Sequence, residues 1–310
     1  MISDHLIITG INILLAWSVY IALLTGSLSF AQGAFMAIGC YAAGYMTTHF
    51  DIPFWPATLA AAALTAAFAA LVGFPALRLR GLYLILATLG ITFCVRVLIE
   101  NLDFLGGIGG FGGMLGADLG SVAVAVAGVG AVLALISFSP LQRIFDAVRE
   151  DERVAASLGI NITAVRLIGF SAGAAVAAIG GSLYGHYMSF VRPESFDVLL
   201  SIYVVLYVVL GGVNNMAGPA LGAVVMTLLP EYFRVLADWR PTVFGLAVLV
   251  MLLFRPDGLL SFRLRTARAD KADGLDGAMK DSQGVRRQVA GRPPLPSSGS
   301  VPRSEGGTPQ

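Results

Sequence analysis

Long stretches without a charged side chain alternate with short charged segments along most of this sequence. No Asp, Glu, Lys or Arg lies between Asp4 and Asp51. Further charge-free stretches cover residues 52–77, 119–142, 167–191 and 198–230. A helix that crosses the hydrocarbon layer of a membrane needs about 20 predominantly apolar residues. Each stretch is long enough for one crossing, and the first is long enough for two.

These segments predict an all-α integral membrane protein, a polytopic bundle of eight to ten membrane-spanning helices, some of them broken. The sequence divides most simply into nine spans, since eight or ten would need one segment to be re-entrant or split. The expected spans cover residues 6–25, 28–48, 55–76, 82–100, 119–138, 164–188, 198–213, 217–236 and 242–255. The second span is rich in Gly, Ala and Ser, which let helices approach closely in lipid, so it is expected inside the bundle. A broken or re-entrant second segment is the alternative.

The placement of arginine predicts the orientation of these spans. Basic residues cluster at Arg78 and Arg80, between Arg143 and Arg166, and from Arg255 onward. The loops between these clusters hold only three basic residues, Arg192, Arg234 and Arg240. Cytoplasmic loops carry the excess of Lys and Arg, so the arginine-rich set is expected in the cytosol. Nine spans then put the N-terminus outside and the C-terminus in the cytosol.

Composition supports a membrane-embedded domain followed by a different kind of segment. The chain is 56% hydrophobic and 13% charged, whereas soluble domains carry about 25% charged residues. Residues 1–260 are expected to form the transmembrane domain. Residues 261–310 are rich in Arg, Asp, Gly, Pro and Ser and are expected to be a disordered cytosolic tail. Cys40 and Cys94 each lie in an apolar run, which predicts buried thiols and no disulfide.

The charged segment 139–166 is the most informative part of the sequence. Leu141, Ile144, Phe145, Val148 and Ala155 recur near helical spacing, with charged residues between them. This pattern predicts one or two short amphipathic helices on the cytosolic face, too polar to insert into the membrane. Such a segment is either a solvated connector lying on the headgroups or a docking site for a soluble partner.

Residues 147–161, AVREDERVAASLGIN, resemble the cytosolic loop of LivM-type permease subunits of branched-chain amino acid ABC transporters. In both, charged and small residues alternate before a Leu/Met-Gly-Ile-Asn turn. The same family resemblance is carried by other segments: SLSFAQGAFMAIGCYAAGY, GLYLILATLGI, GGIGGFGG, GGSLYGHYMSFVRPESFDVLLSI, VVLGGVNNMAGPALGA and FRPDGL. It extends over about residues 10–260, and the tail beyond about 265 has no recognised counterpart.

The resemblance implies a permease subunit that moves branched-chain or related amino acids inward across the bacterial cytoplasmic membrane. It implies that the loop is a coupling helix that sits in a groove of an ATP-binding subunit. The implied coupling residues are Arg149, Glu150, Asp151, Glu152, Ala155, Ala156, Leu158 and Gly159. The implied partners are a second, LivH-like permease subunit, two ATP-binding subunits, an external solute-binding protein and membrane lipid, with no nucleic acid.

The residues themselves argue against enzymatic chemistry in this chain. A P-loop needs GxxxxGK[ST], whose lysine reaches the phosphates. The two lysines, Lys271 and Lys280, lie in ADKAD and AMKDS, so ATP and Mg²⁺ are expected on partner subunits and no cofactor here. The three histidines are scattered, so no metal site is expected. Without the resemblance, an ion-coupled carrier or channel for a small polar solute such as urea or amides remains the alternative function, as does a purely structural membrane subunit.

A few polar residues within the spans are candidates for the translocation path or gate: Gln32, Gly33, Arg96, Asn214 and Asn215. Arg96 and Glu100 lie four residues apart on one helix face. Their alternative role is an ion pair near the external interface. The two asparagines lie among glycines and prolines that are expected to break a helix on the cytosolic side.

Overall fold

The computed structural model describes residues 2–79, 81–213, 215–232 and 245, which form an almost entirely helical structure. The contacts of the chain divide it into residues 1–261 and residues 262–310. The predicted tail and nearly all of the predicted span 242–255 lie outside the described residues.

Ten α-helices and two very short strands make up the described part. The helices are α1 (Ile2–Leu24), α2 (Gln32–His49), α3 (Phe54–Ala76), α4 (Leu82–Glu100), α5 (Leu119–Phe138), α6 (Pro140–Glu150), α7 (Glu152–Ser157), α8 (Ile162–Met188), α9 (Val198–Gly211) and α10 (Ala217–Tyr232). Short 3₁₀ turns are η1 (Asp103–Leu105), η2 (Gly107–Gly109) and η3 (Pro193–Phe196). Among the described residues, α1, α3, α4, α5 and α8 are long and apolar enough to cross a membrane. The predicted all-α membrane fold is confirmed.

Helix α8 lies at the centre of the bundle and packs against α1, α2 and α3. Small residues make this close packing possible. A methyl group on Gly173 would lie 2.5 Å from the Ser18 carbonyl oxygen of α1, and one on Gly181 would overlap the Met36 carbonyl oxygen of α2. In lipid, helices associate through such close contacts, because burial of apolar surface supplies no driving force between them.

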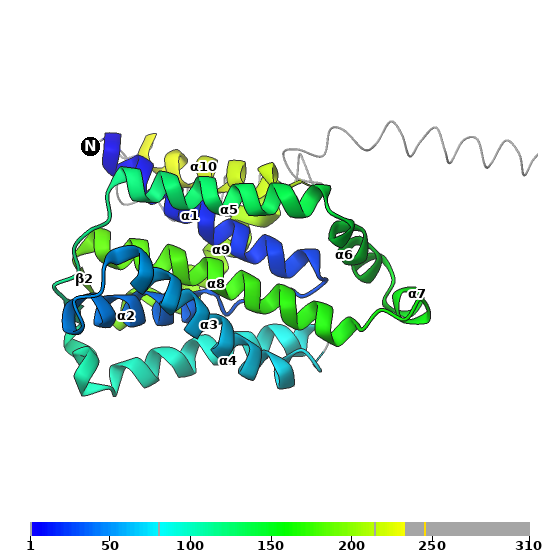
Figure 1. The fold of residues 1–310 in the computed structure, drawn as a ribbon, viewed down its shortest axis with the longest axis horizontal. Helices are drawn as coiled ribbons and strands as arrows, with labels where there is room; N and C mark the ends of the chain where they lie inside the picture. Colours follow the sequence, from blue (N-terminus) through cyan, green and yellow to red (C-terminus); the bar gives the residue numbers. More distant parts are fainter. Residues whose placement is uncertain (1, 80, 214, 233–244, 246–310) are drawn as a thin grey trace, which may run out of the picture. The chain divides into compact units, whose positions relative to one another are not determined.

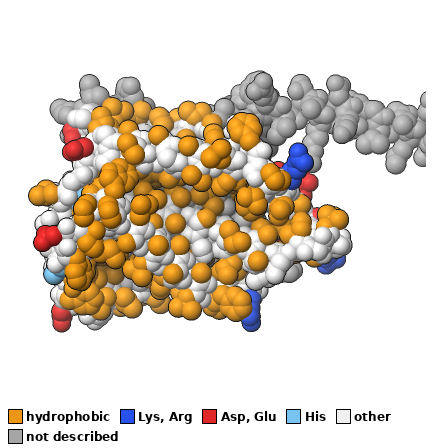
Figure 2. Space-filling view, in the orientation of Figure 1, with side chains coloured by type: hydrophobic (Ala, Val, Ile, Leu, Met, Phe, Trp, Pro, Cys, Tyr) orange, Lys and Arg blue, Asp and Glu red, His pale blue; other side chains and the backbone are white. Residues whose placement is uncertain are grey.

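The two ends of the bundle differ. Helices α6 and α7 project at one end (Figure 1), here named the α7 end. At the other, the strand end, β1 (Phe111–Gly112) pairs antiparallel with β2 (Phe190–Val191). Figure 2 shows hydrophobic side chains over the middle of the surface and charged side chains at the two ends, with Lys and Arg gathered at the α7 end. This distribution is that of a membrane-embedded surface between two aqueous ones.

The two cysteines differ from each other. Cys40 is fully buried against α8, as predicted, but Cys94 is exposed, and both are unpaired. The prediction for Cys94 was wrong because a lipid-facing surface is as apolar as a protein core. An apolar sequence environment therefore does not identify a buried side chain.

Candidate functional site

The α6–α7 segment (residues 139–161) consists of two short helices separated by a turn at Asp151. Ser139 caps α6 by accepting a hydrogen bond from the backbone N of Leu141 at 3.3 Å. Asp151 ends α6 and caps α7, since its Oδ1 accepts from the backbone N of Arg153 at 2.8 Å and of Val154 at 3.2 Å. These caps explain why the predicted amphipathic segment folds as two helices.

Helix α7 is held to the bundle by one side and exposes the other. Ala155 is fully buried, whereas Val154 is 56% and Leu158 71% exposed. Gly159 ends the turn with φ of +81°, a conformation that favours glycine. An open hollow of about 630 Å³ lies beside α7, lined by Arg149, Glu150, Asp151, Glu152, Arg153, Ala156 and Ile162. The structure thus places the predicted coupling residues in one segment. Ala155 differs from the others because it is buried between α7 and the bundle.

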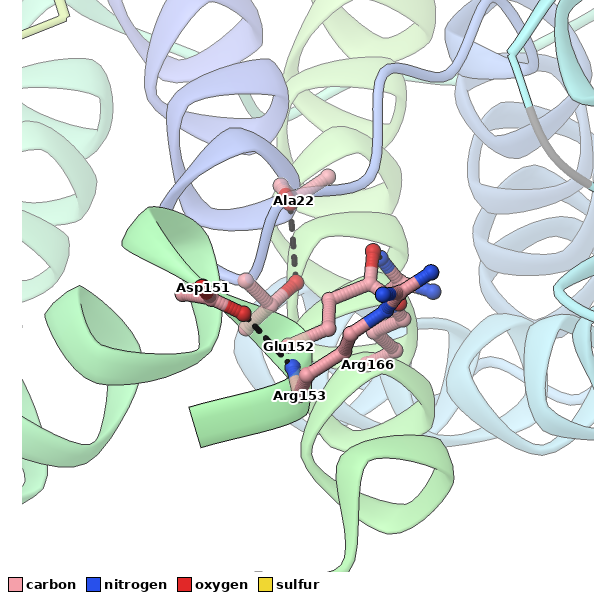
Figure 3. A network of polar contacts seen from close by, with 6 residues as sticks. Ala22, Asp151, Glu152, Arg153 and Arg166 are labelled. Carbon is pink, nitrogen blue, oxygen red and sulfur yellow. Dashed lines mark hydrogen bonds and ion pairs between the residues drawn. The ribbon is translucent and has the colours of Figure 1, made fainter. Parts of the chain in front are cut away.

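An ion pair connects α7 to α8. Glu152, the first residue of α7, contacts Arg166 in the second turn of α8 (Figure 3), and the Arg166 side chain is only 14% exposed. A methyl group added to Gly26 would lie 3.9 Å from the Arg166 Nη2 atom, so Arg166 is also close to Gly26. A cavity of about 150 Å³ is lined by Glu152, Arg166, Gly26 and Ser27, among others. The ion pair therefore adjoins the start of the connection between α1 and α2.

That connection, residues 25–31, enters the bundle without forming a helix. Ser27 and Ser29 are each 1% exposed and Ala31 is fully buried. The backbone of Phe30 forms two hydrogen bonds with α4. Its N donates to Thr88 Oγ1 at 3.1 Å, and its O accepts from Thr92 Oγ1 at 3.0 Å. Both threonines lie near the middle of α4, so α2 begins near mid-span. Non-helical backbone at membrane depth is tolerated where protein surrounds it.

Helix α9 begins at the same depth. Asp197 caps it, its Oδ1 accepting from the backbone N of Leu200 at 3.2 Å. The N of Gly33, at the start of α2, donates to Ser201 Oγ at 2.9 Å. A methyl group on Gly33 would lie 2.9 Å from the Asp197 carbonyl oxygen and 3.1 Å from Thr92 Cγ2. The N-termini of α2 and α9 therefore meet inside the bundle, and we call this meeting point the helix crossing.

The length of α9 agrees with this depth. Its 14 residues extend about 21 Å, short of the roughly 30 Å hydrocarbon layer. Residues 189–197 connect α8 to α9, as predicted, but the end of this connection is buried inside the bundle. Phe196 is buried and packs edge-on against Tyr41 of α2, with ring centroids 6.0 Å apart. Between β2 and the start of α9, the chain therefore passes from the strand end into the interior of the bundle.

The other predicted path residues fall in three places. Gln32 and Gly33 lie at the helix crossing, and Gln32 is 1% exposed with its Oε1 atom unpartnered among the described residues. Arg96 bonds Glu100 through Nε at 2.8 Å, which confirms the predicted alternative of an ion pair. Asn214 lies outside the described residues. Asn215 lies between α9 and α10, where its Oδ1 accepts from Ala217 N at 3.5 Å.

Sequence reasoning missed Thr88, Thr92, Asp197 and Ser201 as members of the crossing. The available signal was weak: isolated hydroxyls within apolar spans, and an aspartate directly before the charge-free stretch 198–230. In the described part of the chain, no group of three or more His, Cys, Asp or Glu side chains could hold a metal ion.

Comparison with known proteins places the sequence in a family. Residues 1–255 match the family described as "Branched-chain amino acid transport system / permease component". The chain is 31% identical to the LivM permease protein of the Escherichia coli high-affinity branched-chain amino acid transport system over 273 residues, which cover 76% of this chain and 64% of that protein. The chain therefore spans somewhat less than two thirds of the length of this relative.

Shorter matches extend the comparison. The BraD permease protein of Pseudomonas aeruginosa is 35% identical over 128 residues, covering 40% of this chain and 41% of BraD. The LivH permease protein of Escherichia coli is 29% identical over 137 residues, covering 42% of this chain and 44% of LivH. No solved structure matches the chain. The match over most of its length shows that the chain is a multi-pass membrane protein belonging to the branched-chain amino acid transport permease family.

Proposed function

We propose that this chain is a membrane-spanning subunit of an ATP-binding cassette importer that moves branched-chain or related amino acids inward across the bacterial cytoplasmic membrane. Two ATP-binding subunits supply the energy, because the sequence holds no P-loop. A second, related permease subunit completes the pathway, and an external binding protein delivers the solute. Family membership and the exposed α6–α7 segment support this function.

In this proposal the α7 end faces the cytosol. Arg143, Arg149, Arg153 and Arg166 all belong to the helices that meet at this end, and the excess of basic residues marks cytosolic loops. Helix α1 then runs inward from an external N-terminus. The binding protein is placed at the strand end, where η1, η2, β1 and β2 lie.

The observation that carries the docking assignment is the exposed apolar side of α7 beside a charged hollow. Val154 and Leu158 are spaced four residues apart, so they lie on one helix face. Leu158 is the residue that directly follows α7. Arg149, Glu150 and Arg153 line the hollow beside the same helix. An apolar anchor surrounded by charges is typical of a helix that inserts into a groove of a soluble partner.

Replacing Leu158 with aspartate is expected to detach the ATP-binding subunits. Truncation of an interface anchor costs about 2 kcal/mol or more, which corresponds to more than a tenfold loss of association. The measurement is the amount of ATP-binding subunit that copurifies with the full-length tagged chain, together with leucine uptake in reconstituted vesicles.

Leu115→Asp is the matched control for this experiment. Leu115 is 76% exposed, like Leu158 at 71%, but it follows β1 at the opposite end of the bundle. The control should retain normal copurification. If Leu158→Asp also retains it, α7 is not the docking helix. ATP-independent uptake that follows membrane potential would instead support an ion-coupled carrier.

A further inference from the structure

A small cavity lies beside the helix crossing. Its volume is about 270 Å³, and it is bounded by α1, α2, α8 and α9. Ile11 and Leu15, which line it, lie in the middle of α1, so the cavity reaches the centre of the span. Ligand sites in proteins usually measure about 300–1,000 Å³. This cavity lies just below the lower end of that range, which favours a solute smaller than most ligands.

The lining of the cavity has two parts. Ile11, Leu15, Met36 and Val204 give it an apolar wall. Asp197, Asn12 and the hydroxyl-bearing Tyr184, Tyr203 and Tyr207 provide polar groups. A mostly apolar cavity with a few convergent polar groups is the usual form of a small-molecule site. The polar set contains one carboxylate and no basic side chain.

Asp197 is the unusual member of this set. Ionisable side chains at membrane depth are costly and are generally functional. Among the described residues, its carboxylate accepts one hydrogen bond, the cap of α9 through Oδ1, whereas an ionised carboxylate has about four acceptor sites. Asparagine and serine cap helices about as well as aspartate, so the cap does not require the negative charge.

Gln32 is a further buried polar group at the crossing, next to the residues that line the cavity. Its amide is buried and its Oε1 atom has no hydrogen-bond partner among the described residues. It lies one turn before Met36 on the same face of α2, and Met36 lines the cavity. A buried amide oxygen without a partner is destabilising unless something else supplies a donor.

We propose that this cavity is a solute site for an α-amino acid with a short apolar side chain. The Asp197 carboxylate accepts the solute ammonium group, and the N-terminus of α9, whose Leu199 and Leu200 line the cavity, carries partial positive charge that favours the solute carboxylate. The wall of Ile11, Leu15, Met36 and Val204 contacts the aliphatic side chain. This inference rests on the proposed function and adds the place of the site and the residues that form it.

Asp197→Asn tests the site because it retains the α9 cap and removes the charge. The assembled transporter, containing the full-length chain and its partner subunits, is reconstituted in vesicles. Uptake of labelled L-leucine is measured at saturating loaded binding protein and per assembled complex, with ATP hydrolysis in parallel. We expect Asp197→Asn to lower uptake about tenfold or more, since hydrogen bonds to charged groups are among the stronger ones, while ATP hydrolysis continues.

Asp118→Asn is the matched control, because Asp118 also occupies the N-cap position of a membrane-spanning helix, α5, but is exposed. It should transport at the normal rate. If Asp197→Asn does not assemble, Asp197→Ser is the second uncharged capping variant.

Three outcomes separate the two proposals. Reduced leucine uptake by the Asp197 variants alone supports the site. Normal leucine uptake by an assembled Asp197 variant overturns the site and leaves the proposed function intact. If the unaltered complex carries urea but no leucine, the amino acid assignment fails and the site fails with it.

Discussion

Replacing Gly181 with alanine is expected to destabilise the folded protein strongly, which lowers its thermal midpoint and its monodisperse yield. The added methyl group would overlap the Met36 carbonyl oxygen, which belongs to the backbone of α2 and cannot rotate away as a side chain could. Overpacking in a well-packed core typically costs 1–3 kcal/mol. We expect about 3 kcal/mol here, because α8 must move away from α2 and loses contacts along both helices.

The neighbouring Gly180 provides the control for this prediction. A methyl group on Gly180 would meet Leu15 Cδ2 at 3.5 Å, an ordinary contact. Alanine also favours a helix over glycine by up to about 1 kcal/mol. Gly180→Ala should therefore match or exceed the unaltered protein in monodisperse yield after detergent extraction and in thermal midpoint. Equal behaviour of the two variants would contradict the close α2–α8 contact.

The helical membrane fold could be predicted from the sequence because each long span leaves a local signal. The five full-length helices fall within a few residues of their predicted positions. The Arg96–Glu100 pair was predictable for the same reason, since two residues four apart on a helix are neighbours in space. The two helices of the α6–α7 segment follow from local spacing and from caps that lie next to them in sequence.

The helix crossing could not be predicted, because its defining contacts join distant parts of the chain. The second span was expected to begin at residue 28, but α2 begins at Gln32. The reason is the pairing of the Phe30 peptide with Thr88 and Thr92, residues 58 and 62 positions away. Local composition does not encode such a partner. Likewise, nothing near Asp197 in the sequence indicates that it lies beside Gly33.

The roles predicted for the coupling residues and for Gln32 and Gly33 remain predictions, but the structure relates the two groups. The Glu152–Arg166 pair adjoins Gly26, and Gly26 belongs to the connection, residues 25–31, that leads to Gln32 at the start of α2. We expect a movement of α7 to act on the start of α2 through Arg166 and residues 25–31. This is a short physical route from the proposed docking helix to the helix crossing.

Reversing the charge of Glu152 is expected to interrupt this route and abolish uptake. In Glu152→Arg, two guanidinium groups would face each other, and Arg166 is only 14% exposed. Losing one partner of a fully buried pair costs about 3–5 kcal/mol. We expect about 2–3 kcal/mol here, because the Glu152 side chain is 33% exposed and solvent screens part of the interaction. That energy favours α7 leaving α8, so ATP hydrolysis would no longer be coupled to uptake.

The exchanged variant, Glu152→Arg with Arg166→Glu, separates the ion pair from other roles of these residues. It has the same net charge as the unaltered chain and places opposite charges at the same contact. If the pair transmits the movement of α7, the exchange should recover a substantial part of the leucine uptake lost in either single variant, measured per assembled complex. If the exchanged variant is no better than the single variants while the complex still assembles, the two residues act separately, and the proposed route from α7 to α2 is wrong.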